Sequence, residues 1–448
     1  MQGKINPREI VLDLLMEVNE KNTYSHVVLG AALKKFQYLS KEDRSFISKV
    51  FQGTLERQIT IDAVINAYSK VSTTRMKPVI RNLLRLSVYQ ILYLEKIPDS
   101  AAVNEAVKLA VKRHFDSLRG FVNGVLRNIS RNKEDLPIED TLSLRYSMPE
   151  WLCEEFVEEY GEETTKKILQ GFLERKPMYI HLNTSLQEKE AWMKALFEEG
   201  VKVREVEGLS DTLELQEYDY LEGLSTYQKG GFHIQDVSSQ VADLVAYSLV
   251  SSGNVLDVCA APGGKSIHLA IHGNGAYTIE SRDVSPRKLA MMDAEIERLQ
   301  LQHISTKVYD ACQKDESKKG SVDLLLCDLP CSGIGIIGRK SDIKYRMNKE
   351  SQMDLVKLQQ DILANVVDDL KDQGILIYST CTIHKAENEG NVNYIKETLG
   401  LTPVDLTRIL PAWVMDYERN QETAKQGYVQ LLPGIHPCDG FFISAFRK

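Results

Sequence analysis

The sequence lacks several features that would define its class at once. It has no run of about 18 apolar residues that could cross a membrane. Its first ten residues, "MQGKINPREI", contain no apolar core of a secretion signal. Cysteine is sparse, with seven residues in 448, an odd number without the spacing of a disulfide framework. We therefore expect a cytoplasmic protein with reduced thiols and no membrane partner.

Two nucleotide-binding motifs are incomplete or missing at the main glycine loop. The stretch "VLDVCAAPGGKS" ends like a phosphate loop, but Cys259 replaces the first glycine of that motif. Pro262 also has no N–H to offer a phosphate. The dinucleotide fingerprint G-x-G-x-x-G is absent here as well. These departures disfavour an ATP-dependent enzyme, and they leave a strand, a tight turn and a helix N-terminus that would hold another ligand.

Charge is distributed unevenly along the chain. The formal net charge is −8, yet residues 1–140 carry +6 and residues 141–240 carry −10. Apolar residues at helical spacing predict an all-α domain over residues 1–138. A basic domain on an acidic protein favours contact with a polyanion.

One predicted helix of this domain, "SLRGFVNGVLRNISR", has two distinct faces. The face opposite its apolar residues carries polar side chains at intervals of four: Arg119, Asn123, Arg127 and Arg131. We interpret this stripe as an RNA-binding surface, because arginines suit phosphate recognition. A solubilising helix face is the alternative.

The rest of the chain predicts two further domains. Residues 139–231 read as a small α+β unit. Residues 232–448 alternate strands and helices, which predicts an α/β domain with a doubly wound parallel sheet. The last stretch, "GFFISAFRK", predicts one further edge strand. The chain is thus expected to be multidomain.

Acidic residues follow the strands of the predicted parallel sheet. Asp283 ends the second strand, where its carboxylate can accept the hydroxyls of a ribose. Asp310 ends the third strand, where it could bind an adenine amino group. Together with the glycine loop, these carboxylates outline a nucleoside-binding site that lacks a phosphate-binding motif. S-adenosylmethionine fits that outline.

Two thiols and an aspartate occupy the ends of the next two strands. "CDLPCSGIG" places Asp328 and Cys331 after the fourth strand, and "YSTCTIH" places Cys381 after the fifth. A zinc site of Cys327, Cys331, Cys381 and His384 is disfavoured, because its spacing lacks the C-x2-C knuckle. We expect no metal. Three other cysteines are interpreted as buried apolar residues: Cys153, Cys312 and Cys327.

Paired thiols suit methylation of carbon 5 of cytosine. That carbon becomes nucleophilic only after a thiolate adds to carbon 6. The scheme also needs a carboxyl group near N3 and a group that assists elimination. The residues alone do not decide which thiol attacks.

These motifs together resemble the RNA cytosine-5 methyltransferases of the Nol1/Nop2/Sun family. The likeness lies in "DVCAAPGGKS", "DLPCSGIGIIGRKSDIK", "STCTI", "FHIQDVSSQ" and "DGFFISAFRK". The N-terminal block resembles the all-α RNA-binding domain of the antitermination factor NusB. The resemblance implies an RNA-recognition-like fold for the small subdomain and a Rossmann-like fold for the methyltransferase domain.

The resemblance also implies roles for individual residues. It makes Cys381 the nucleophile and Cys331 the group that assists product release, while Asp328 contacts N3 of the cytosine. The implied S-adenosylmethionine site has ten members: Cys259, Ala260, Ala261, Pro262, Gly263, Gly264, Lys265, Asp283, Asp310 and Asp328.

The resulting hypothesis is methyl transfer to a cytosine of 16S rRNA or its small-subunit precursor, by a monomer. The same chemistry on another rRNA or tRNA cytosine is one alternative. A non-catalytic RNA-binding ribosome assembly factor is the other, although the intact thiols and glycine loop argue against it.

Overall fold

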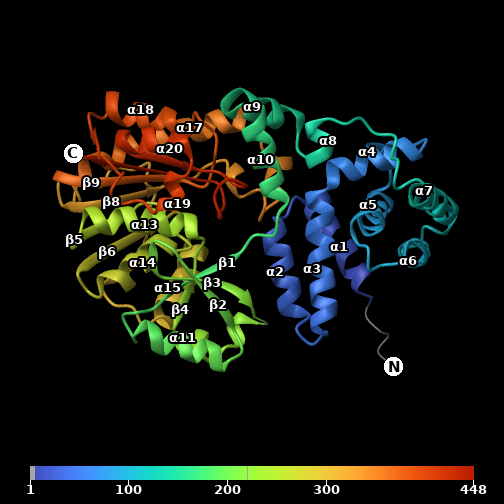
Figure 1. Ribbon diagram of the computed structural model, residues 1–448, viewed down its shortest axis with the longest axis horizontal. Coiled ribbons are helices and arrows are strands. Elements are labelled where there is room, and N and C mark those ends of the chain that lie inside the picture. Colours follow the sequence, from blue (N-terminus) through green and yellow to red (C-terminus); the bar gives the residue numbers. More distant parts are fainter. Residues whose placement is uncertain (1–5, 219) are drawn as a thin grey trace. The chain divides into compact units, whose positions relative to one another are not determined.

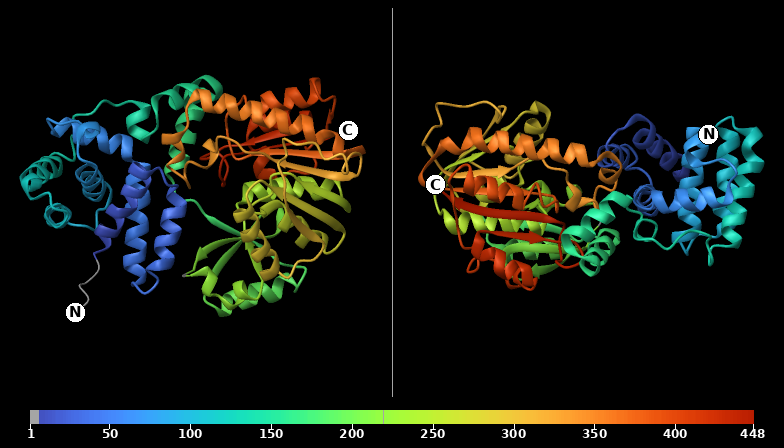
Figure 2. Two further views of the ribbon diagram at one scale, coloured as in Figure 1. Left: turned by 180° about the vertical axis from the view of Figure 1, so that it is seen from behind. Right: turned by 90° about the horizontal axis from the view of Figure 1, so that it is seen from above.

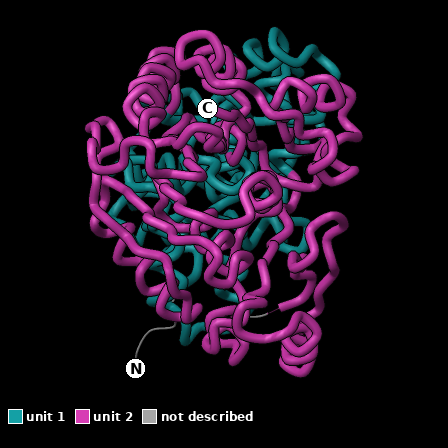
Figure 3. Tube along the Cα trace, turned by 90° about the vertical axis from the view of Figure 1, so that its left-hand side faces the viewer, with its two compact units in different colours: residues 1–173, 337–346 teal, residues 174–336, 347–448 magenta. Residues whose placement is uncertain are grey.

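The computed structural model describes residues 6–218 and 220–448, and they form two compact units (Figure 3). The first unit comprises the chain up to Leu173 together with residues 337–346. The second comprises residues 174–336 and 347–448. In the described chain no helix is both long and apolar enough to cross a membrane.

The first unit is built from helices, as predicted for its first 138 residues. They are α1 (Pro7–Lys21), α2 (Ser25–Lys35), α3 (Lys41–Glu56), α4 (Gln58–Tyr68), α5 (Pro78–Tyr93), α6 (Asp99–Lys112), α7 (Arg119–Arg131), α8 (Leu142–Tyr146), α9 (Glu150–Tyr160), α10 (Glu162–Leu173) and α16 (Ile343–Arg346) (Figure 1). Helix α5 lies at the centre, with eleven of its sixteen residues buried. Helices α8 to α10 also belong to this unit, so the predicted boundary after residue 138 does not separate compact units.

A segment from the C-terminal part of the sequence is embedded in the first unit. Lys344 donates hydrogen bonds of 2.6 Å to the carbonyls of Glu56 and Ser147, and Tyr345 donates one to the carbonyl of Leu55. Burial lowers the pKa of Lys344 to about 7. Residues 337–346 thus complete the helical unit, which no pattern in the sequence indicated.

The second unit begins with a small antiparallel sheet of strand order β2-β3-β1-β4. Its elements are β1 (Met178–Leu182), α11 (Lys189–Glu198), β2 (Lys202–Val206), β3 (Leu209–Glu217), α12 (Ser225–Gln228) and β4 (Phe232–Ile234). Trp192 and Leu196 of α11 pack with Leu213 of the sheet in one apolar cluster. Strand β4 pairs with β1 although it follows the predicted boundary at residue 231.

The second sheet has the order β10-β12-β9-β8-β5-β6-β7. Its strands are β5 (Gly253–Asp257), β6 (Tyr277–Asp283), β7 (Ile304–Val308), β8 (Val322–Asp328), β9 (Leu370–Thr380), β10 (Thr402–Pro403), β11 (Tyr428–Leu431) and β12 (Phe441–Arg447). Strands β5 to β9 pair in parallel, as predicted. The expectation of an edge strand at the end of the chain was wrong. Strand β12 lies inside the sheet, because β9 pairs with one side while β10 and β11 pair with the other.

Helices cover both faces of this sheet (Figure 1), and Figure 2 shows the layers from behind and from above. They are α13 (Val237–Leu249), α14 (Gly264–Gly273), α15 (Pro286–Arg298), α17 (Lys349–Val366), α18 (Glu389–Glu397), α19 (Ala412–Met415) and α20 (Glu418–Thr423). Alternate residues of β8 enter different cores. Leu324 and Leu326 pack with α13 and α14, whereas Leu325 and Cys327 pack with α17 and α18. This alternation is what a sheet buried on both faces requires.

Two helical glycines of the first unit provide a paired test of its packing. A Cβ at Gly53 of α3 would lie 2.0 Å from the ring of buried Tyr89, whereas nothing lies within 4 Å of a Cβ at Gly30 of α2. We expect Gly53→Ala to destabilise the unit by about 1–3 kcal/mol, because the ring must move. Gly30→Ala should stabilise it by about 0.5–1 kcal/mol. Midpoints of guanidinium denaturation check both, and shifts of the same sign would contradict the packing.

Candidate active site

The predicted cofactor loop lies between β5 and α14, at the carboxyl end of the parallel sheet. The connection spans residues 258–263, and Gly263 adopts a left-handed φ of 106° at the helix N-cap. A Cβ there would lie 2.8 Å from Met292 Cγ. The Ala260 N–H donates a 2.7 Å hydrogen bond to the carbonyl of Arg282 on the neighbouring strand. The loop is thereby fixed against β6.

The two acidic residues predicted for a nucleoside follow the next two strands of the sheet, β6 and β7. Asp283 is the buried last residue of β6, and its Oδ1 accepts a 2.8 Å hydrogen bond from the Ser285 N–H. Asp310 is exposed two residues after β7. Arg282, which the sequence sets next to Asp283, donates instead to Glu280 and Asp315 at 2.6 Å each.

Lys265 forms the central ion pair of the site. Its Nζ lies 2.6 Å from Asp328 Oδ2 and 3.1 Å from Ser239 Oγ. It also lies 4.9 Å from the centre of the Phe441 ring. Burial alone would lower the pKa of Lys265, but Asp328 and other carboxylates raise it overall, so the ammonium stays charged. The second oxygen of Asp328 accepts a 3.0 Å hydrogen bond from Ser379 Oγ.

The two predicted cysteines lie side by side. Cys331 follows β8, Cys381 follows β9, and their sulfurs are 3.3 Å apart. The hydrogen bond with Cys381, together with burial, raises the pKa of Cys331 well above its usual value. Cys331 therefore keeps its proton at neutral pH and can donate it in a hydrogen bond to the other sulfur.

The remaining cysteines follow the predictions in part. Cys327 is fully buried in the apolar core on one face of the sheet, which agrees with its apolar interpretation. Cys153 is buried as well. The same interpretation of Cys312 was wrong, because this thiol is exposed in the turn after Asp310.

The predicted RNA-binding residues lie on α7 of the first unit. Val122, Val125, Leu126 and Ile129 bury one face of this helix. Arg119, Arg127 and Arg131 are exposed on the rest of its surface, and Arg127 Nε donates a 3.0 Å hydrogen bond to Asn123 Oδ1. The four polar residues thus share a solvent-facing stripe.

Several residues of the site escaped the sequence analysis. Ser239 and Gln235 lie in "FHIQDVSSQ", a stretch that belongs to the family likeness but whose pattern singles out neither residue. Gln235 Nε2 donates to Ser239 Oγ at 3.2 Å and to Asp243 Oδ2 at 2.7 Å. A partly buried chain of hydrogen bonds therefore extends from Asp328 through Lys265, Ser239 and Gln235 to Asp243. The only signal in the sequence was a group of polar residues at the start of a helix.

A glycine pattern further along the chain has a packing role. Residues 333–338 spell the G-x-G-x-x-G letters, yet they follow Cys331 and form a short 3-10 turn instead of a strand–helix junction. A Cβ on Gly335 would lie 2.2 Å from the carbonyl of Gly440 and 2.8 Å from that of Cys381. The glycine allows this close backbone contact between the two cysteine loops and the start of β12.

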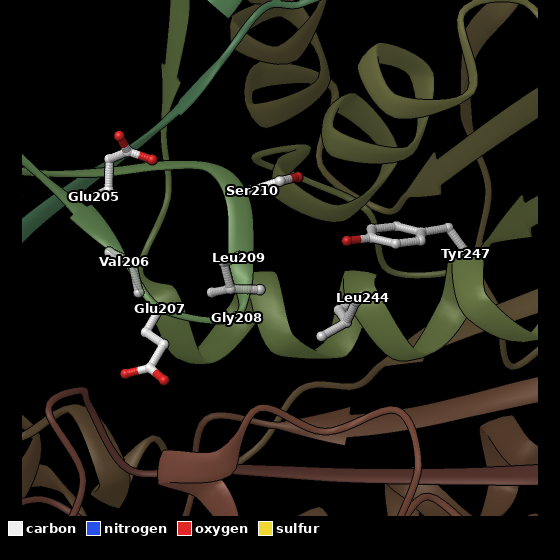
Figure 4. Close-up of a pocket in the computed structure, with 8 residues that line it drawn as sticks. All are labelled: Glu205, Val206, Glu207, Gly208, Leu209, Ser210, Leu244 and Tyr247. Atoms are coloured by element: carbon white, nitrogen blue, oxygen red, sulfur yellow. The ribbon is translucent and has the colours of Figure 1, made fainter.

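A separate hollow of about 640 Å³ opens between the β2–β3 turn and α13 (Figure 4). It is lined by Glu205, Val206, Glu207, Gly208, Leu209, Ser210, Leu244 and Tyr247. None of the predicted site residues lines it, so the candidate active site is defined by its side chains and not by this hollow.

The fold and the site together define a Rossmann-like methyltransferase. The sheet is largely parallel with one antiparallel strand inserted, a glycine loop follows β5, and acidic side chains lie at the next strand ends. Comparison with family models agrees. A model described as 16S rRNA methyltransferase RsmB/F matches residues 245–447. Models of the NusB family and of an RsmF/B-like ferredoxin-like domain match residues 5–131 and 148–219.

Relatives extend this likeness over the whole chain. The probable ribosomal RNA small subunit methyltransferase B of Bacillus subtilis is 34% identical over 99% of both chains. The protein of that name from Escherichia fergusonii is 28% identical over the full length of both. The chain therefore belongs to the RsmB/F family of 16S rRNA methyltransferases.

Solved structures show the same fold. The crystal structure of PH0851 has a TM-score of 0.81 at 24% identity and covers 99% of both chains. NSun6 from Pyrococcus horikoshii with SFG has a TM-score of 0.57 at 20% identity, and covers 67% of this chain and 98% of its own.

The buried carboxyl at the far end of the hydrogen-bond chain predicts a pH dependence of stability. Burial raises the pKa of Asp243 to about 8, although Lys265 opposes it. In the unfolded chain this carboxyl ionises near pH 4, so folding takes up a proton between pH 5 and 8 and stability falls as pH rises. Between pH 5 and pH 8 we expect the free energy of unfolding of Asp243→Asn to fall by less than that of wild type, with a difference of at least about 1.4 kcal/mol.

Guanidinium denaturation midpoints at pH 5 and pH 8 measure the difference. The amide leaves a buried N–H2 group without an assigned acceptor, but that cost does not depend on pH and cancels in the comparison. Asp354→Asn, at an exposed position on α17, serves as the control. An equal loss in wild type and Asp243→Asn would show that Asp243 is ionised throughout.

Proposed function

We propose that the protein transfers a methyl group from S-adenosylmethionine to carbon 5 of a cytosine in 16S rRNA, through a covalent bond between Cys381 and carbon 6. One observation carries this proposal: two thiols 3.3 Å apart beside a lysine–aspartate ion pair, at the strand ends of a methyltransferase fold. A methyltransferase that needs no covalent activation of its substrate has no use for such a pair.

The residues at the first two strand ends suit S-adenosylmethionine. Within the described chain, the only hydrogen bond to the Asp283 side chain is at Oδ1, which leaves Oδ2 for a ribose hydroxyl. Helix α14 begins at Gly264, and the free N–H groups of its first turn suit a carboxylate. The structural neighbour NSun6 was solved with SFG, an S-adenosylmethionine analogue. When bound, this cofactor supplies an electrophilic methyl group.

The thiols divide the work between them. The thiolate of Cys381 adds to carbon 6 of the cytosine, and the electron pair of the double bond then makes carbon 5 nucleophilic. Asp328 is held by Lys265 and Ser379. In this proposal its carboxylate accepts a hydrogen bond from the amino group of the cytosine, and from N3 once that nitrogen gains a proton as the thiolate adds. After methylation, carbon 5 loses its proton to a base and the bond between sulfur and carbon 6 breaks.

The properties of Cys331 suit this last step. Because its pKa is raised well above the usual value, it keeps a proton that can form a hydrogen bond to the departing sulfur. The strand positions alone leave the attacking thiol open, and the choice of Cys381 rests on the family resemblance. The same chemistry would serve a cytosine in another RNA, and the substrate assignment rests on the family.

Substitution of each thiol separates their roles. Cys381→Ala should reduce methylation of 16S rRNA to background while binding of S-adenosylmethionine persists, because only the nucleophile is lost. Cys331→Ala should permit attack and slow release, so that a covalent protein–RNA adduct accumulates. A methylation assay, cofactor titration and a denaturing gel provide the measurements. Cys312→Ala, at the exposed thiol, is the control. Retained methylation in Cys381→Ala would refute the nucleophile assignment.

The stripe on α7 is proposed to bind RNA phosphates. Reversal of two exposed charges, Arg119→Glu with Arg127→Glu, should weaken RNA binding and reduce the slope of log affinity against log salt by about 1.4–1.8. Lys34→Glu with Lys35→Glu at the end of α2 makes the same change in net charge and should leave the slope closer to wild type. Filter binding over a salt series measures both slopes. Equal slopes in all three proteins would make the α7 stripe a solubilising face.

A further inference from the structure

The two loops that carry the thiols share one buried carboxylate, that of Glu387. This side chain is fully buried between the end of β9 and the start of α18. The residue directly after Cys331 binds it twice. The N–H of Ser332 donates to Oε2 at 2.9 Å, and its hydroxyl donates to Oε1 at 2.5 Å. The carboxylate thus fixes both the backbone and the side chain next to the first thiol.

The residue directly after Cys381 joins the same cluster. Thr382 Oγ1 lies 2.7 Å from Ser332 Oγ. Because the Ser332 hydroxyl donates to the carboxylate, the Thr382 hydroxyl donates to Ser332. Thr382 Oγ1 in turn accepts a 3.2 Å hydrogen bond from the His384 N–H. A continuous series of donors therefore runs from the second cysteine loop through the first to Glu387.

Helix α17 completes the attachment of the first loop. Gln359 Nε2 donates to Glu387 Oε2 at 3.0 Å and to the carbonyl of Pro330 at 2.9 Å. Residues on both sides of Cys331 are consequently held by one carboxylate, either directly or through Gln359. The backbone of Glu387 is held too, because its carbonyl accepts a 2.5 Å hydrogen bond from the hydroxyl of Tyr378 on β9.

We infer that Glu387 is a positioning residue that sets the spacing between the Cys331 and Cys381 sulfurs. Its described side-chain contacts are with Ser332 next to Cys331, with Gln359 of α17, and with His384 of the second cysteine loop. It reaches Thr382, next to Cys381, through Ser332, so it acts on the thiols through these neighbours. Hydrogen bonds to an ionised carboxylate are stronger than those between neutral groups. Its two oxygens accept from Ser332 of the first loop and Gln359 of α17, and Oε1 also lies 3.2 Å from His384 Nδ1 of the second loop. That the spacing matters for catalysis rests on the proposed function, whereas the positioning itself does not.

The test replaces the carboxylate by an amide of nearly the same shape. In Glu387→Gln, one oxygen becomes an N–H2 group that faces donors, so at least one of the bonds to Ser332 or Gln359 is lost. The loss of one charge-assisted bond lowers the equilibrium population of the observed sulfur–sulfur spacing, relative to other spacings, by about tenfold or more. We expect kcat to fall by up to about 100-fold, because misplacement by about 1 Å has effects of that size. KM for S-adenosylmethionine should change little.

A second readout does not depend on methyl transfer. Diamide takes up one hydrogen from each thiol as the sulfur–sulfur bond forms, and its azo group is reduced to a hydrazine. The sulfur–sulfur bond of a disulfide is about 2.05 Å long, so the two sulfurs, which are 3.3 Å apart, must approach by about 1.2 Å. Mass spectrometry of the peptide linked through Cys331 and Cys381 follows the rate. We expect cross-linking to be about tenfold slower in Glu387→Gln than in wild type.

Two further variants make the outcome decisive. Glu389→Gln changes a neighbouring carboxylate that pairs with Arg419, and it should retain the wild-type rate. Ser332→Ala removes only the hydroxyl and should give an intermediate rate even if Glu387→Gln does not fold. Wild-type rates of cross-linking in Ser332→Ala, or in a folded Glu387→Gln, would overturn the inference. Slower cross-linking without methylation by the wild-type protein would instead refute the proposed function and leave the positioning intact.

Discussion

The ion pair between Lys265 and Asp328 connects the two halves of the candidate site. Lys265 belongs to the first turn of α14, and Asp328 ends β8, so the pair ties the glycine loop to the loop of Cys331. Removing these charges from water is costly, and their attraction offsets that cost only if their remaining hydrogen-bonding capacity is also used. Ser239 and Ser379 supply such bonds, and the Phe441 ring adds a favourable surface for the ammonium. The pair therefore requires α13, β9 and β12 to be in place around it.

The parallel pairing of β5, β6, β8 and β9 explains why these polar groups meet. Parallel strands end at one edge of the sheet, and the side chains that follow them are no longer enclosed by the two apolar cores. Polar residues inside the sheet need a partner, as Asp257 shows. Its Oδ2 accepts a 2.7 Å hydrogen bond from Ser266, whose hydroxyl in turn accepts one of 2.8 Å from Ser281. Burial nevertheless raises the pKa of Asp257 to about 7, so this carboxyl supports the loop largely as a neutral group at lower pH.

Local patterns in the sequence were sufficient for much of this arrangement. The periodicity of apolar residues predicts the helical first unit and the parallel strands, and the strand ends locate Asp283, Asp328, Cys331 and Cys381. Contacts between distant residues were not predictable in the same way. Ser332 and Glu387 are 55 positions apart, and Ser25 and Asp342 are 317 apart. Likewise, the interior position of β12 depends on the short strands β10 and β11, whose few residues give no clear alternation.

The segment of residues 337–346 also has its buried polar groups satisfied by partners. It is part of the first unit, although the chain on both sides of it belongs to the second unit. The chain leaves the second unit after Ile336, five residues beyond Cys331, and returns to it at Met347. Within the first unit, the buried Nζ of Lys344 has carbonyl acceptors on Glu56 and Ser147, and Asp342 accepts from the N–H of Ser25 at 3.2 Å. A fragment without the first 173 residues would retain Lys344 and Asp342 but lose these partners. A fragment of the first 173 residues alone would lack residues 337–346, which complete the helical unit. Residues 337–346 therefore belong by their contacts to the helical unit, and not to the unit that flanks them in the sequence.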